Sequence, residues 1–268
     1  MNTKFFDSQW QSVLCQHETK IKNYSPSELC SVLSEFEIVD ELERELFQFE
    51  NYPKQNFSVD AFGQPSFTIW RREGISLDVY FWFESNLEIH SHNFEGAFKI
   101  LRGKSFNVEY NFASQDEYSW GRVGNLEHMP FYQLKKGDCR EISGQNFIHA
   151  VIHCEKPTIT LCFRKDPADE PLNFYLYPNY EITLDKRLEL ILQKKMLLEK
   201  NSSYSVFDYD RLSESELGYM IGKSYYGTFN SEMIHNIAKK YPWYEKLKLG
   251  RANHELHRLK LQKLVSSL

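Results

Sequence analysis

The chain has 268 residues, of which 41% are hydrophobic and 26% are charged, an ordinary composition for a globular domain with appended elements. Its formal net charge of −5 supplies no basic field for a phosphate backbone, and no run of about 18 apolar residues occurs, so the composition argues against nucleic-acid binding and against a membrane span. The five cysteines form no CxxC pair and the first residues resemble no secretory leader, which favours a cytoplasmic protein with reduced thiols.

Residues 1–56 are predicted to form a helical segment. Ser25, Pro26 and Glu28 mark a helix start, because they give a serine cap, a proline in the first turn and a glutamate three residues after the cap. Apolar residues then recur at roughly helical spacing as far as Phe47.

Residues 57–174 are predicted to form a β-barrel. Short apolar or alternating segments lie at 75–83, 98–101, 106–112, 131–134, 146–153 and 158–163. Glycine-containing turns separate several of them, at 102–104 and at 136–138. Many short strands at fairly regular spacing, with 15% aromatic residues overall, are typical of a sandwich or a closed barrel.

Residues 175–268 are predicted to form a helical region. An amphipathic stretch begins at 188–195, a second capping box lies at 213–216, and leucines from Leu247 onward mark a last helix. The basic residues of that last helix are mixed with glutamates and are interpreted as a solvated face. The sequence therefore predicts a mainly β protein whose barrel is flanked by N- and C-terminal helices.

Two histidines separated by one residue carry the chemistry. On an extended strand His90 and His92 project from the same face, so their imidazoles can bind one metal ion. His149 lies in a later apolar strand, and His153 shares its face. Three protein ligands leave open positions on the metal, which catalysis requires.

These residues resemble the two motifs of the cupin superfamily, over roughly residues 75–165. His90, His92 and Gly103 match the first motif, and Gly137 and His149 match the second. The resemblance implies a jelly-roll barrel that holds one divalent metal. Most cupins also bind the metal with a glutamate three or four residues past the second histidine. Here Gly96 occupies that place, and Glu95 is a candidate fourth ligand or otherwise a loop carboxylate.

The glycine at this position makes the site similar to cysteine dioxygenase and its bacterial thiol dioxygenase relatives, which bind iron with three histidines. Trp82 matches the tryptophan that precedes their histidine pair, and Arg71 or Arg72 lies where an arginine grips the substrate carboxylate. Those enzymes also carry a Ser-x-His-x-Tyr run, which is replaced here by Thr160-Leu161-Cys162-Phe163-Arg164. This departure puts cysteine in doubt as the substrate.

Further site residues follow from strand phase. Arg164 is in phase with Thr158, Thr160 and Cys162, so it is expected to face the interior and hold a substrate carboxylate, with Arg71 and Arg72 as alternatives. Tyr80 and Trp82 are expected to line the cavity. His153 is a candidate for a supporting or proton-transfer role, or otherwise a partly exposed histidine near the mouth of the barrel. Cys162 is interpreted as a thiol beside the site or a small buried filler. His128, His235, His254 and His257 are predicted to lie on the surface.

The resemblance implies a non-haem Fe(II) dioxygenase or oxygenase that uses O₂ and a small carboxylate- or thiol-bearing molecule. One alternative is an isomerase or lyase that uses Zn, Mn or Ni, because three imidazoles do not select one metal. Another is a ligand-binding regulatory cupin whose helical ends contact a partner. Cupins commonly pair, so a homodimer is also an expectation.

Overall fold

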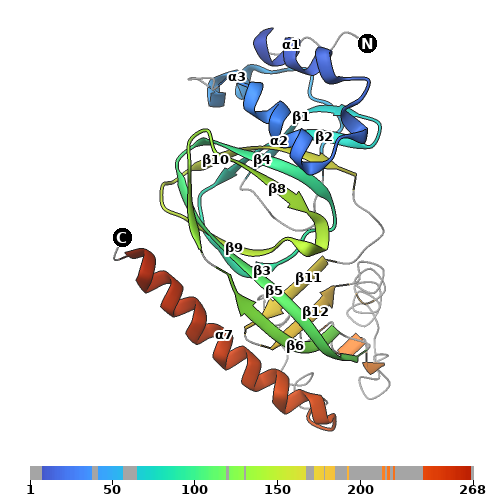
Figure 1. Ribbon diagram of the computed structural model, residues 1–268, viewed down its shortest axis with the longest axis vertical. Coiled ribbons are helices and arrows are strands. Elements are labelled where there is room, and N and C mark those ends of the chain that lie inside the picture. The colour runs from blue at the N-terminus through green and yellow to red at the C-terminus, as the bar shows by residue number, and fades with distance from the viewer. Residues whose placement is uncertain are drawn as a thin grey trace, which may run out of the picture.

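The computed structural model describes residues 8–37, 42–56, 65–118, 121–129, 131–166, 172–177, 179–184 and 238–266, together with residues 192, 213, 214, 216, 217 and 220. Helices at the two ends of the chain flank a barrel of two antiparallel sheets (Figure 1). Among the described residues no helix is long and apolar enough to cross a membrane.

The N-terminal helices are α1 (Ser8–His17), α2 (Pro26–Glu35) and α3 (Leu42–Gln48), with the short 3-10 helix η1 (Ile21–Asn23) between the first two. The predicted start of α2 is confirmed as a capping box. The Glu28 amide donates to Ser25 Oγ at 3.3 Å, and the Ser25 amide donates to the Glu28 carboxylate at 2.7 Å.

Twelve described strands form the two sheets. The first sheet has the order β1 (Ser66–Arg72), β2 (Ile75–Trp82), β10 (Thr158–Lys165), β4 (Glu95–Arg102) and β8 (Cys139–Ser143). The second has the order β6 (Gly121–His128), β12 (Tyr180–Leu184), β11 (Leu172–Leu176), β3 (Asn86–His90), β9 (Ile148–His153), β5 (Lys104–Tyr118) and β7 (Tyr132–Lys135). The 3-10 helix η2 (Gly144–Asn146) leads into β9.

The strand order within these sheets is that of a jelly roll. Strands β2-β10-β4-β8 face strands β3-β9-β5-β7, so along the chain the path passes back and forth between the sheets. The predicted fold class, a cupin-type barrel with α extensions, is thereby confirmed.

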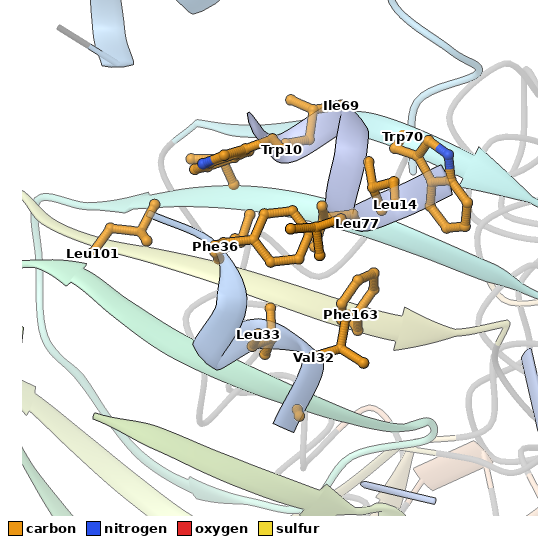
Figure 2. Close-up of a cluster of buried hydrophobic side chains, with 14 of the residues drawn as sticks. Trp10, Leu14, Val32, Leu33, Phe36, Ile69, Trp70, Leu77, Leu101 and Phe163 are labelled. Atoms are coloured by element: carbon orange, nitrogen blue, oxygen red, sulfur yellow. The ribbon is translucent and has the colours of Figure 1, made fainter. Parts of the chain in front are cut away.

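Both faces of the first sheet are covered, which explains why β2 is buried along almost its whole length. Ile75, Leu77, Val79 and Phe81 point outward into a core shared with α1 and α2. Figure 2 shows part of this core, where Trp10 and Phe36 of the helical segment lie against Leu77 and Phe163 of the sheet. The alternate residues of β2 therefore face the barrel interior.

The second sheet has its own outer core. Ile89, Val108 and Ala150 pack together on the side away from the barrel interior, and Leu261 of α7 (Pro242–Ser266) joins them. The long helix α7 runs beside β5 and β6 in Figure 1. Because each sheet has a separate outer core, the space between the sheets is left for the functional site.

Gly103, the last matched residue of the first cupin motif, is required by its position. It has a φ of +87°, and a Cβ there would lie 2.8 Å from Thr158 Oγ1. A side chain would therefore be strained and would collide with β10 at the turn from β4 to β5. The motif glycine is explained by close packing and turn geometry.

The structure corrects one expectation about the C-terminal part. The region from residue 175 was predicted to be helical, but β11 and β12 pair there and extend the second sheet. Two-residue alternation around Tyr175 and Tyr180 is too short a signal to separate a strand from a helix. The amphipathic stretch at 188–195 lies outside the described residues apart from Leu192, whereas the capping box at 213–216 and the last helix are present.

His254 and His257 are also corrected, because both lie where α7 meets the second sheet. His254 is buried and its Nδ1 accepts a hydrogen bond from the Tyr177 amide at 3.2 Å. His257 stacks on Tyr177 with 4.1 Å between ring centroids. His128 is exposed as predicted, and His235 lies outside the described residues.

Candidate metal centre

The three predicted ligands converge inside the barrel. His90 ends β3 and lies opposite His149 in the antiparallel register of β3 with β9. His92 follows two residues later and is held by its amide, which donates to Gly144 O at 3.3 Å. One ring nitrogen from each residue lies within 4.8 Å of the others, and His92 Nε2 is 2.9 Å from His149 Nε2. The three rings converge as the sequence predicted, and their binding of a metal ion stays a prediction.

Hydrogen bonds fix the ring orientation of two of the histidines. His90 Nδ1 lies 2.8 Å from Glu88 O, and His149 Nδ1 lies 2.7 Å from Asn107 Oδ1. A carbonyl oxygen only accepts, so each Nδ1 carries the proton and each Nε2 keeps its lone pair. This tautomer is the one that a metal ligand needs.

The amide orientation of Asn107 supports that assignment. Its Nδ2 donates to Tyr132 Oη at 2.6 Å and to Glu109 Oε1 at 3.1 Å, which leaves Oδ1 for His149. Asn107 is fully buried, and the Tyr132 hydroxyl in turn donates to Glu109. A partly buried network therefore runs from a predicted ligand to strand β7.

The electrostatics of the histidines also fit a cation. Burial lowers the pKa of His90 to about 4 and lowers those of His92 and His149 well below their usual value, because desolvation disfavours the charged rings. Neutral imidazoles are the form that binds metal. Lone pairs that face one another across a few ångströms are stabilised when a cation lies between them, so the donor set fits a divalent metal.

A cavity of about 100 Å³ lies beside the three histidines. Six of the other predicted site residues line it: Tyr80, Trp82, His153, Thr160, Cys162 and Arg164. The remaining wall is mostly apolar and includes Phe94, Phe98, Ile100, Leu134, Ile142 and Val151. The structure thus gathers residues from both sheets around one partly open cavity.

Arg164 faces this cavity, as strand phase predicted. Its guanidinium carbon lies 4.5 Å from the centre of the Phe94 ring. Its Nε is buried and has no hydrogen-bond partner within the part of the chain that the structure describes. An arginine held on an aromatic face with an unused donor is suited to an anionic group.

Trp82 connects the aromatic wall to the polar residues. It stacks on Tyr80 with 5.7 Å between ring centroids and on His153 with 5.1 Å, and its indole N–H donates to Thr160 Oγ1 at 3.0 Å. His153 Nδ1 lies 2.9 Å from Ser105 Oγ. These contacts place each ring firmly; the catalytic and binding roles assigned to them stay predictions.

Three expected site residues lie elsewhere. Arg71 donates to Asp166 at 3.2 Å and Arg72 pairs with Glu18, and neither lines the cavity. They lie at the end of the edge strand β1, which carries an irregularity between Thr68 and Trp70 and packs outside the barrel. Glu95 is exposed, and Lys165 donates to it at 3.0 Å, so it is not a fourth ligand.

No carboxylate reaches the centre from the neighbouring position either. A Cβ on Gly96 would lie 2.1 Å from Phe163 O of β10, so a side chain does not fit there without a shift of the backbone. Of the described residues, only the three histidines form a group able to hold a metal ion.

Sequence reasoning missed Asn107 and Asp78. Asp78 is buried, accepts from Asn56 Nδ2 at 2.9 Å and from the Tyr80 hydroxyl at 3.3 Å, and its pKa is raised by burial. A signal for Asp78 existed, since it is the one acidic residue in the strand 75–82 and shares the face of Tyr80 and Trp82.

Acidification should weaken the fold through His153. Burial lowers its pKa in the folded state to about 4, against about 6.5 in an unfolded chain. Between these values only the unfolded state takes up the proton, so stability is complete above about pH 6.5 and falls toward about pH 4, by up to about 3 kcal/mol for this residue. Urea unfolding at about pH 7.5 and about pH 5 measures the effect. A His153→Asn variant should lose less stability than the wild type between these two pH values. An equal loss in both proteins would contradict the prediction.

No family model and no curated protein matches the sequence. Solved structures share partial likeness with it. DMSP lyase DddQ from Ruegeria pomeroyi aligns with a TM-score of 0.34 and 11% identity over 62% of this chain and 95% of that one. A cupin superfamily protein from Desulfitobacterium hafniense aligns with a TM-score of 0.27 and 12% sequence identity. The match covers 43% of this chain and 95% of that one. A hydroquinone 1,2-dioxygenase, PnpCD, in complex with Cd²⁺ and 4-hydroxybenzonitrile aligns with a TM-score of 0.29 and 9% sequence identity. That match spans 37% of this chain and 62% of the other.

Proposed function

We propose that this protein is a metal-dependent cupin enzyme, a non-haem Fe(II) dioxygenase or oxygenase that acts on a small carboxylate- or thiol-bearing molecule. One observation carries the proposal: the imidazoles of buried His90 and His149 and of half-buried His92 converge on the wall of a partly open cavity that also contains Arg164. Bound Fe(II) would supply oxygen activation there.

The size of the cavity supports a small substrate. Its volume of about 100 Å³ is below the roughly 150 Å³ of an engineered protein cavity that admits benzene. Flat aromatic walls at Tyr80 and Trp82 favour a compact or planar molecule. The substrate is therefore expected to have few atoms beyond its reacting group and its anionic group.

The charge of the site supports an anionic substrate. No carboxylate among the described residues joins the three histidines, so the charge of a divalent metal would not be offset by a ligand. Arg164 adds a positive charge on the opposite sheet, where it would hold a carboxylate by a two-pronged contact. The substrate would then place a thiolate or enolate beside the metal and a carboxylate on Arg164, so that each positive group has an anionic partner.

The remaining residues would position the substrate and move protons. Tyr80 and Trp82 would pack against it, and Thr160 and Cys162 would border it on β10. His153, whose Nδ1 lies 2.9 Å from Ser105 Oγ, would pass on a proton at that end of the cavity.

Oxygen uptake tests the proposal. The protein loaded with Fe(II) should consume O₂ with at least one compound in a panel of small thiols and carboxylates. Arg164→Lys should raise the half-saturating concentration of a carboxylated substrate by about tenfold or more, because Lys cannot form the two-pronged contact. Lys165→Ala, beside it but paired with Glu95 at the surface, should leave that concentration unchanged.

Other outcomes would favour the alternatives. Stoichiometric Zn, Ni or Mn without oxygen uptake would replace the dioxygenase by an isomerase or lyase. Failure to bind any of these metals would leave a ligand-binding regulatory cupin. A homodimer is proposed as the assembly, and sedimentation would test it.

A further inference from the structure

Two cysteines meet where helix α2 crosses the outer face of the first sheet. Cys30 lies on α2 and Cys139 begins β8, and both side chains pack against the core that the helix and the sheet share. Ser34 Oγ, one turn further along α2, lies 3.6 Å from Cys139 Sγ. Both cysteines are partly exposed, so a small reagent can reach the pair from solvent.

A buried lysine fixes this junction. Lys99 of β4 donates through Nζ to Phe36 O at 2.7 Å and to Leu33 O at 3.2 Å, at the end of α2. Both carbonyls belong to the C-terminal end of α2, so Lys99 anchors the helix to the sheet. The same ammonium group lies close enough to Cys139 to favour its thiolate.

The surroundings divide the pair into one thiolate and one thiol. Cys30, Ser34 and the charge of Lys99 together lower the pKa of Cys139, against the opposing effects of burial and of the Asp138 charge. The pKa of Cys30 is raised by its contact with Cys139, by burial and by Glu141, with Arg140 acting in the other direction. Thiolates are the reactive form, so Cys139 is the nucleophile and Cys30 the neighbouring thiol.

We propose that Cys139 and Cys30 form a peroxide-sensitive dithiol that closes into a disulfide and clamps helix α2 to strand β8. The Cys139 thiolate attacks one oxygen of hydrogen peroxide, forms the S–O bond of a sulfenic acid and releases hydroxide. The Cys30 sulfur then attacks the Cys139 sulfur, the S–O bond breaks, and the Cys30 proton leaves with the hydroxyl group as water. Two thiols are oxidised and one peroxide is reduced.

The expected consequence is a stiffer junction between the helical segment and the barrel. The disulfide would join residues far apart in sequence, which removes conformational freedom from the unfolded chain. β8 also contributes Ile142 to the wall of the cavity, so the clamp acts on an element of the site without touching a metal ligand. The proposal does not depend on the reaction proposed above.

Peroxide treatment of the full-length protein tests the inference. After exposure to hydrogen peroxide and alkylation of the remaining thiols, peptide mapping should find a Cys30–Cys139 disulfide that dithiothreitol reverses. Thermal unfolding of the oxidised protein should shift to a higher midpoint. Cys15 and Cys154, both exposed, serve as internal controls and should keep their thiols at the dose that oxidises the pair.

Two variants separate the steps. Cys30→Ser should accumulate a sulfenic acid on Cys139 that dimedone labels, because the second thiol is missing. Cys139→Ser should leave Cys30 reduced. The inference would be overturned if mapping of the unmodified sequence found no Cys30–Cys139 bond, or if Cys15 or Cys154 were oxidised first.

Discussion

Removal of His149 is expected to lower metal affinity by more than about 100-fold, the upper end of what loss of a supporting residue costs in metal sites. The His149 ring lies 4.7 Å from that of His90 and 5.0 Å from that of His92, between centroids, so it completes the triangle. A site with two histidines and no carboxylate cannot replace it, since Gly96 has no side chain and Glu95 is paired with Lys165.

The experiment compares metal stoichiometry and calorimetric Zn²⁺ affinity of the wild type with those of His149→Ala. His128→Ala, which removes an exposed histidine on β6, is the matched control and should bind as the wild type does. Circular dichroism of each protein shows whether the fold is intact, and His149→Gln provides a larger side chain if alanine destabilises the barrel. Stoichiometric metal at unchanged affinity in a folded His149 variant would disprove the centre.

The histidines could be predicted because their arrangement is encoded locally. Two-residue periodicity places His90 and His92 on one face, and the apolar strand after Gly144 places His149 on another strand of the same interior. The same reasoning correctly turned Arg164 inward with Thr160 and Cys162. Which face of a strand a residue occupies follows from its residue number relative to its neighbours, so it can be read from the sequence.

The errors concern contacts that depend on how distant elements pair. Arg71 and Arg72 lie away from the cavity because β1 is an edge strand with an irregular register. No local sequence pattern indicates either property. His254 is buried because α7 packs on the second sheet, although its neighbours Asn253 and Leu256 are exposed. Position within a strand is therefore more predictable than the neighbours across it.

Asn107 is the clearest example of such a cross-strand contact. It follows the β4–β5 turn by a few residues, and nothing in its own segment distinguishes it from a surface asparagine. The register of β5 with β9, in which Glu109 lies opposite His149 and Asn107 lies opposite Val151, brings it diagonally beside the ligand. Its hydrogen bond to His149 Nδ1 at 2.7 Å then becomes part of the site.

Replacement of Asn107 with leucine is expected to weaken metal binding by about 10- to 100-fold, because the partner that fixes the His149 tautomer and ring orientation is lost. Asn111→Leu, two strand positions beyond Glu109 and exposed, is the control.

Affinity alone would not separate a positioning role from general damage to the barrel, so the Co²⁺-loaded protein should also be compared by visible absorption. A shifted ligand-field spectrum in Asn107→Leu, with a spectrum like that of the wild type in Asn111→Leu, would show that His149 has turned. Unchanged affinity and an unchanged spectrum in Asn107→Leu would mean that β9 itself holds the ring. In that case the network through Tyr132 and Glu109 would serve only to satisfy buried polar groups.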